Sequence, residues 1–158
     1  MEPFVRDYPA CERRLAATLP AHLGREERLR VCVELLWEHL RGRGVHWLGV
    51  YLINESRDAL LLRECRPGPA CSPIPLHGVC GRAWKEGRTQ VVEDVTALGE
   101  AHIVCDPANL SEVVVPLFDP DGACYGVLDL DSRQKAAFAE ADAEGLRRVL
   151  QAAGLTAR

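Results

Sequence analysis

The sequence predicts an α+β fold, with helices packed on one face of an antiparallel sheet and a loop-rich ligand cavity on the other. Long helical patterns occur only near the two ends of the chain, and strand-like segments fill its middle. Short polar turns join neighbouring strands, which is typical of antiparallel hairpins. The chain has 158 residues with no internal repeat and no linker. A chain of this length buries roughly 70% of its unfolded surface as one domain, so we predict a single domain.

The helical patterns define the two ends of the domain, residues 1–44 and 133–158. Residues 8–22 are predicted to form a first helix. The segment REERLRVCVELLWEHLRGRG, residues 25–44, repeats apolar residues every three or four positions and ends in glycines, which indicates a second helix. The segment AFAEADAEGLRRVLQAAG, residues 137–154, is predicted to be the last helix. The residues expected to face the core are Leu29, Val33, Leu36, Leu40, Phe138, Leu146, Val149 and Leu150.

The central region, residues 45–132, is predicted to form the sheet and the loops of the site. A first hairpin pairs VHWLGVYLIN (45–54) with ALLLREC (59–65) across the polar turn NESRD. The following segment, CRPGPACSPIP (65–75), contains four prolines. Proline lacks the backbone N–H that a sheet needs, so this segment is predicted to be a loop.

A short helix, a strand and a second hairpin complete this region. GVCGRAWKEG (78–87) indicates a helix bounded by glycines, and TQVVEDV (89–95) indicates a strand. Residues 96–111 are predicted to be a loop. SEVVVPLFDPDGACYGVLDLDS (111–132) is the clearest hairpin, because two apolar strands flank the turn Asp-Pro-Asp-Gly at 119–122.

Composition and charge exclude several kinds of partner and location. The formal net charge is −4, which argues against binding to nucleic acid or to an anionic membrane. No apolar run approaches the roughly 20 residues of a membrane span. The N-terminal segment MEPFVRDYPACERR lacks the apolar core of a signal peptide. We therefore expect a cytoplasmic protein with neither a nucleic-acid nor a membrane partner.

Seven cysteines in a chain without an export signal are not expected to form a structural disulfide framework. No CxxC pair occurs, so no metal site is expected. Cys32 and Cys124 fall within helix and strand patterns, where a cysteine packs as a small apolar residue. The remaining cysteines are Cys11, near the N-terminus, and four in or beside loops, where reactive thiols tend to lie: Cys65, Cys71, Cys80 and Cys105.

Strand geometry places polar and aromatic side chains on one face of the predicted sheet. Asp129 and Asp131 are two residues apart in GVLDLDS, so both carboxylates point to the same face while the neighbouring leucines point to the core. Trp47, Gly49 and Tyr51 share a face by the same rule, and a strand glycine often marks close approach of a ligand or another backbone. Spacing alone leaves open whether the carboxylates face bulk water or a ligand, and whether the aromatic residues are core.

Cys105 lies on a predicted loop seven residues before Glu112, which opens a strand. A thiol and a carboxylate at these positions could share a cavity. His102, three residues before Cys105, could assist the thiol or lie on the surface as a solvated group. The sequence contains no P-loop, dinucleotide-binding glycine pattern or Ser/His/Asp order.

Three blocks of the sequence together resemble a known family. GVCGRAWKEGRTQVVEDV, HIVCDPANLSEVVVPL and GVLDLDS occur in the order and approximate spacing of the GAF-type free methionine-(R)-sulfoxide reductases. HWLGVYLI is similar to the first-strand signature of that family. The resemblance implies a single GAF domain over residues 1–158 and an enzyme that reduces free L-methionine-(R)-S-oxide to L-methionine.

The resemblance also implies which residues form the site. It marks Cys105 as the nucleophile, and Cys71 and Cys80 as further redox thiols. The substrate pocket that it implies consists of Trp47, Tyr51, Glu112, Asp129 and Asp131. Like charges in one cavity do not all ionise cheaply, so one of the three carboxylates is expected to have a raised pKa and to act as general acid.

The implied cycle oxidises Cys105 to a sulfenic acid, which a second thiol converts to a disulfide. Thioredoxin or another dithiol then reduces the disulfide, and no bound cofactor is needed. The resemblance makes Cys71 the expected resolving thiol. The loops RECRPGPAC and LGEAH depart from the family pattern, so Cys65, six residues away on the same loop, is an alternative. The role of Cys80 stays open.

Two other functions fit part of the sequence. A stand-alone GAF sensor would bind a small ligand, and a cysteine redox switch would explain the thiols but not the carboxylates. A homodimer is implied by the resemblance and by nothing in the composition.

Overall fold

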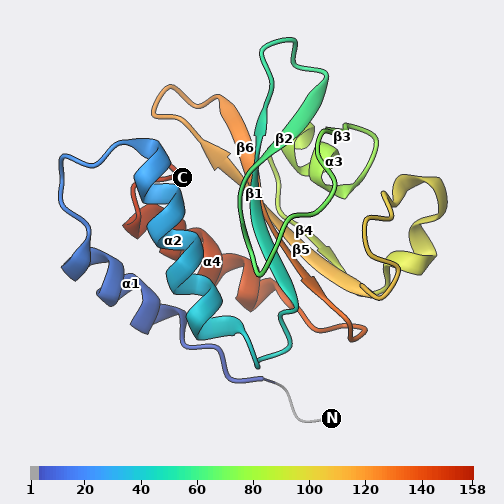
Figure 1. The fold of residues 1–158 in the computed structure, drawn as a ribbon, viewed down its shortest axis with the longest axis horizontal. Helices are drawn as coiled ribbons and strands as arrows, with labels where there is room; N and C mark the ends of the chain where they lie inside the picture. Colours follow the sequence, from blue (N-terminus) through green and yellow to red (C-terminus); the bar gives the residue numbers. More distant parts are fainter. Residues whose placement is uncertain (1–3) are drawn as a thin grey trace.

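The computed structural model describes residues 4–158 and confirms the α+β fold, with a six-stranded antiparallel sheet in the order β3-β2-β1-β6-β5-β4 (Figure 1). Among these residues no helix is long and apolar enough to cross a bilayer. The strands are β1 (Trp47–Ile53), β2 (Ala59–Arg66), β3 (Ile74–Pro75), β4 (Gln90–Val92), β5 (Ser111–Phe118) and β6 (Cys124–Ser132). The helices are α1 (Tyr8–Thr18), α2 (Arg25–Leu40), α3 (Val79–Glu86), the 3-10 helix η1 (Val95–Ala101) and α4 (Glu140–Ala152).

The long helices α1, α2 and α4 cover one face of the sheet and form the main core with it (Figure 1). All the residues predicted to face the core are buried there, among them Leu36 and Leu146, whose exposed fractions are 0%. The short helix α3 lies on the opposite face, where Val79 and Ala83 pack against Val114 and Val127 of the sheet. The prediction of helices on one face therefore holds for the long helices, and α3 belongs with the loops on the other.

Two predicted loops contain regular structure. Residues 65–75 end in the two-residue strand β3, which pairs with Ala59 and Leu60 of β2. The pairing is possible because β3 is an edge strand, where a proline does not interrupt a ladder on both sides. The predicted loop 96–111 begins with η1, whose first turn is capped by Asp94: its carboxylate accepts a hydrogen bond of 3.0 Å from the backbone N–H of Thr96.

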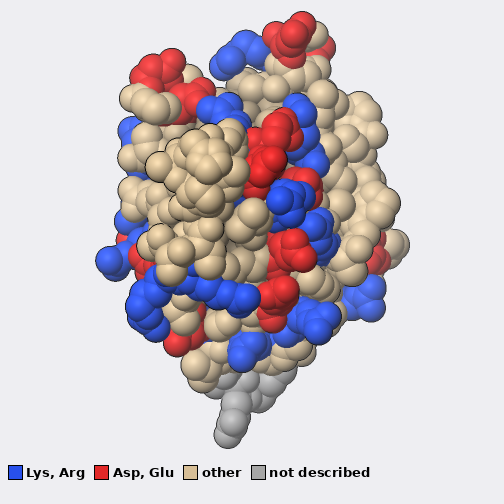
Figure 2. Space-filling view, turned by 60° about the vertical axis from the view of Figure 1, so that its left-hand side comes forward, with Lys and Arg blue, Asp and Glu red and all other residues tan. Residues whose placement is uncertain are grey.

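Figure 2 shows that acidic and basic side chains are interspersed over the face it presents, which brings the side of α1 and α2 forward. Ion pairs connect these helices to their surroundings, including Arg14 with Glu38 at 3.6 Å and Arg63 with Glu26 at 2.9 Å. Exposed pairs of this kind contribute little to stability, at most about 1 kcal/mol each.

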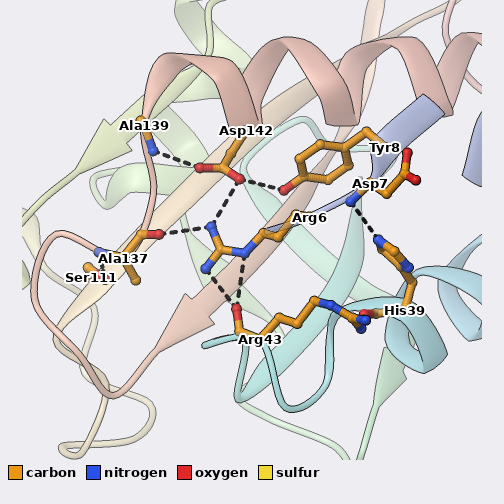
Figure 3. A network of polar contacts seen from close by, with 9 residues as sticks. All are labelled: Arg6, Asp7, Tyr8, His39, Arg43, Ser111, Ala137, Ala139 and Asp142. Carbon is orange, nitrogen blue, oxygen red and sulfur yellow. Dashed lines mark hydrogen bonds and ion pairs between the residues drawn. The ribbon is translucent and has the colours of Figure 1, made fainter. Parts of the chain in front are cut away.

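A buried ion pair joins the segment before α1 to the start of α4 (Figure 3). The Arg6 side chain is 4% exposed, and its Nη1 donates to Asp142 and to the carbonyl of Ala137, both at 2.9 Å. The same guanidinium donates to the carbonyl of Arg43 at 2.8 Å, and the Tyr8 hydroxyl donates to Asp142 at 2.7 Å. Three separate parts of the chain therefore meet on one guanidinium.

Replacing Asp142 by Asn should destabilise the protein by roughly 3 kcal/mol, because it leaves the buried Arg6 guanidinium without its counter-charge. The measurement is the free energy of unfolding in urea. Glu144→Gln is a matched control on the same helix: Glu144 pairs with Arg147, but its side chain is 56% exposed, so less than about 1 kcal/mol should be lost. Equal losses in the two variants would contradict the structural role of the Arg6 pair.

Candidate active site

A cavity of about 430 Å³ opens on the sheet face opposite the long helices. Strands β1, β3, β5 and β6, helix α3 and the loops next to these elements supply its lining. Seven of the eight site residues predicted from the sequence line it: Trp47, Tyr51, Cys80, Cys105, Glu112, Asp129 and Asp131. The eighth, Cys71, is bonded to Cys105.

Strand register places the acidic and aromatic side chains side by side. Asp131 of β6 pairs with Trp47 of β1 on one side and with Glu112 of β5 on the other. Directly paired residues point to the same face of a sheet. The next row toward the middle of β6 pairs Asp129 with Gly49. Two carboxylates of one strand and one of its neighbour therefore meet on the cavity face.

The acidic cluster is costly to ionise. Glu112 and Asp129 are only 7% and 6% exposed. Burial raises the pKa of Asp129 well above its ordinary value, and the charges of Asp131 and Glu112 raise it further. Burial also raises the pKa of Asp131, with Glu112 as the next cause. The pKa values of both aspartates are therefore raised, which disfavours ionisation of all three carboxyl groups together.

One oxygen of the cluster has no partner. Oδ1 of Asp129 is buried and makes no hydrogen bond to any residue in the described part of the chain. A buried acceptor without a donor costs free energy, so it marks a position where a donor is missing. A ligand that brings N–H or O–H groups into the cavity would satisfy it.

Trp47 and Tyr51 form an aromatic wall, with ring centroids 6.2 Å apart. A Cβ atom at Gly49 would lie 2.3 Å from the Trp47 ring, so the indole occupies the space that this glycine leaves. The close approach at Gly49 is therefore made by an aromatic side chain of the same strand, and not by another backbone. Both rings also hold the proline-rich loop: Nε1 of Trp47 donates to the carbonyl of Gly68 at 2.8 Å, and the Tyr51 hydroxyl donates to the carbonyl of Cys71 at 2.9 Å.

Cys71 and Cys105 form a disulfide across 34 residues of sequence, with Cα atoms 5.6 Å apart. It joins the proline-rich loop to the loop before β5. Cys65 and Cys80 are free thiols. Burial, followed by the charges of Asp129 and Glu112, raises the pKa of the Cys80 thiol well above its usual range. The structure therefore pairs two of the predicted redox thiols and keeps Cys80 protonated among the carboxylates.

The loop that carries Cys105 is fixed at both ends, through contacts that sequence patterns did not indicate. The side chain of Ile103 fills the space above Gly78, where a Cβ atom would lie 2.4 Å from it. After Cys105, the backbone N–H of Leu110 donates to the carbonyl of Ser132 at 2.7 Å. Asp106 lies 3.5 Å from Arg133 at the cavity mouth. Cys105 itself is exposed between these contacts.

Cys80, Glu112 and Asp129 each place a potential ligand atom within 4.8 Å of the other two. A cation could contact all three. Metal ions bind the thiolate form of cysteine, so a thiol with a raised pKa is a weak ligand. The expectation that the site uses no metal stays a prediction.

Most of the chain is similar to proteins of one family. A family model described as GAF domain matches residues 22–156. YtsP of Bacillus subtilis is 43% identical over 99 residues, which cover 62% of this chain and only 60% of that relative, less than two thirds of its length. The free methionine-R-sulfoxide reductase of Escherichia coli is 38% identical over 117 residues, covering 73% of this chain and 67% of the relative.

Solved structures show the same similarity over nearly the full chain. The reduced form of fRMsr from Staphylococcus aureus superposes with a TM-score of 0.86 at 33% identity, covering 97% of both chains. A free methionine-R-sulfoxide reductase from Neisseria meningitidis, solved with its substrate, gives a TM-score of 0.83 at 35% identity, covering 97% of this chain and 92% of that one. The single GAF fold expected from the sequence is confirmed.

Replacing Asp129 by Asn should stabilise the protein increasingly as pH rises. The folded state holds the Asp129 proton more tightly than the unfolded chain, whose aspartate pKa is about 3.9. The contribution of this group to the free energy of unfolding therefore falls from about pH 4 up to its raised folded pKa. Asn does not titrate, so the variant should match wild type near pH 4 and melt a few degrees higher at pH 8, at about 2–4 °C per kcal/mol.

The measurement is the melting temperature between pH 4 and pH 8. Glu55→Gln is the control, because Glu55 is exposed in the β1–β2 turn and its removal should give no pH-dependent gain. A lower melting temperature for Asp129→Asn at pH 8 would show that this carboxylate stabilises the fold instead.

Proposed function

We propose that this chain, which belongs to the GAF-domain family of free methionine-R-sulfoxide reductases, reduces free L-methionine-(R)-sulfoxide to L-methionine. One observation carries the proposal: a disulfide between Cys71 and Cys105 lies at a cavity that holds three crowded carboxylates. A ligand sensor needs no such thiol pair, and a redox switch needs no such carboxylates.

The cavity suits a free amino acid. The ammonium of the substrate can donate hydrogen bonds to Glu112, Asp129 or Asp131, including the unpartnered oxygen of Asp129. A methionine sulfoxide within a protein has no such ammonium, so the carboxylates select the free form. Trp47 supplies an apolar wall for the S-methyl group.

The first chemical steps oxidise Cys105 to a sulfenic acid. The Cys105 thiolate attacks the substrate sulfur and forms an S–S bond, while a carboxyl group of raised pKa protonates the sulfoxide oxygen, which leaves that sulfur as water. Water then attacks the Cys105 sulfur and loses a proton, the S–S bond breaks, and its electron pair leaves with methionine. Cys105 is thereby oxidised by two electrons and the substrate is reduced by two. Asp129 and Asp131 are both suited to the acid role.

The second step closes the disulfide. The Cys71 thiol attacks the sulfenic sulfur of Cys105, the S–S bond forms and water leaves. The disulfide between these residues corresponds to this oxidised product. An external dithiol, for which we propose thioredoxin, then reduces this disulfide by thiol–disulfide exchange. The dithiol becomes oxidised and both thiols are restored. Cys80, buried and protonated, contributes no thiolate to this scheme.

The cycle needs a supply of reduced dithiol, which fits a cytoplasmic protein with five free cysteines in its described residues. No bound cofactor enters the scheme. Dimerisation stays a prediction.

The proposed reaction is tested by incubating the protein with dithiothreitol and racemic free methionine sulfoxide, and measuring methionine by chromatography. We expect about half of the racemate to be consumed, because only the R form is a substrate. Cys105→Ser should lower the rate by more than about a thousandfold, since it removes the nucleophile. Cys124→Ser, on β6 outside the cavity lining, is the control. Methionine production by Cys105→Ser at a rate near that of wild type would exclude Cys105 as nucleophile.

Cys71→Ser should separate the two reductants. Dithiothreitol reduces a sulfenic acid directly, so turnover with it should stay within about threefold of wild type. Turnover driven by thioredoxin should fall by about tenfold or more, because no disulfide forms for it to reduce. The matched variant is Cys65→Ser, which should behave as wild type with both. Full thioredoxin-dependent activity of Cys71→Ser, lost only when Cys65 is also replaced, would make Cys65 the resolving thiol.

A further inference from the structure

We propose that Arg133 binds the α-carboxylate of the substrate and so selects an amino acid with a free carboxyl group. This inference rests on the proposed function, because it assigns the second charged group of the same substrate. In the proposed function, the acidic side chains of the site bind the ammonium of the substrate. They leave the α-carboxylate of the substrate without a partner.

Charge in the cavity is one-sided. Four acidic side chains line it, and Arg133 is the single arginine or lysine among the lining residues. The histidines of the lining are His46 and His102. Burial, and then the nearby charge of Arg133, lower the pKa of His46, which favours its neutral form. Arg133 is therefore the permanent positive charge at this site.

The position of Arg133 matches the geometry of an amino acid. Its backbone directly follows β6, two residues after Asp131, and both residues line the same cavity. In a free amino acid the ammonium and the carboxylate are attached to the same carbon atom. A site that binds both groups therefore needs a negative and a positive side chain close to each other. The backbone of Arg133 is held in place because its N–H donates to Nδ1 of His46 at 3.1 Å.

The guanidinium is free to change partners. The Arg133 side chain is 58% exposed, and its one ion pair among the described residues is with Asp106, at 3.5 Å. Asp106 is itself 45% exposed and also accepts a hydrogen bond from the N–H of Ala108 at 2.9 Å. A substrate carboxylate entering the cavity would displace Asp106 and form a charge-assisted pair with better burial. The competing explanation is that Arg133 only fastens the Cys105 loop through Asp106.

The test compares free methionine sulfoxide with methionine sulfoxide amide, which keeps the ammonium but carries an uncharged carboxamide. The readout is the ratio of kcat/KM for the acid to kcat/KM for the amide. Wild type should prefer the acid. Arg133→Gln should lower the ratio by about five- to tenfold, mainly through KM for the acid, as expected for loss of a charge-assisted hydrogen bond. Arg133→Lys should retain most of the preference, because it keeps the charge.

Two further variants separate binding from fastening of the loop. Asp106→Asn removes the competing carboxylate, so the ratio should stay at the wild-type value or rise. Arg30→Gln is the matched control, because Arg30 is a similarly exposed arginine (51%) on α2, behind the sheet. If Arg133→Gln and Asp106→Asn both lowered kcat/KM equally for the acid and the amide, the proposal would be overturned. Arg133 would then act only by holding the Cys105 loop through Asp106. An unchanged ratio in Arg133→Gln would also overturn it. If the wild-type protein reduced neither the acid nor the amide, the proposed function itself would be refuted.

Discussion

Strand β6 carries leucines on one face and aspartates on the other, and its register decides which face meets the helices. Leu128 and Leu130 are fully buried in the helical core, so Asp129 and Asp131 must point to the cavity. A slip of one residue would turn all four side chains to the wrong face. The same pairing brings Glu112 and Trp47 beside Asp131. Burial of two leucines thus fixes the position of the carboxylates.

The carboxylates oppose folding while they prepare the site for chemistry. Burial and mutual repulsion raise the pKa values of Asp129 and Asp131, so their ionised forms destabilise the folded state at neutral pH. The helical layer on the other face, built from fully buried leucines and valines, offsets this cost. A carboxyl group that keeps its proton near pH 7 can donate it to a departing oxygen, which an ordinary aspartate does poorly. The unfavourable electrostatics and the expected activity have the same origin.

Sequence patterns predicted the strands and the faces of their residues because those features repeat with a fixed period. Alternation alone predicts that Asp129 shares a face with Asp131 and that Gly49 shares one with Tyr51, but it does not predict that this face lines a cavity. The loops have no period, so the strand at Ile74–Pro75 and the 3-10 helix at Val95–Ala101 were not predicted. Arg133 was missed for the same reason: a single arginine after a strand has no signature until the fold places it at the cavity. The pairing of Cys71 with Cys105 came from family resemblance, since sequence spacing does not determine which loops meet.

The aromatic wall connects the two chemical steps of the proposed cycle. Cys105 must first meet the substrate in the cavity and then meet Cys71, so the proline-rich loop has to stay close without filling the pocket. Tyr51 and Trp47 achieve this by facing the cavity with their rings while donating hydrogen bonds to the carbonyls of Cys71 and Gly68. Burial and the charge of Asp129 raise the pKa of Tyr51, so its hydroxyl remains a donor at any physiological pH. Residues that would bind the substrate therefore also hold the thiol that would complete the reaction.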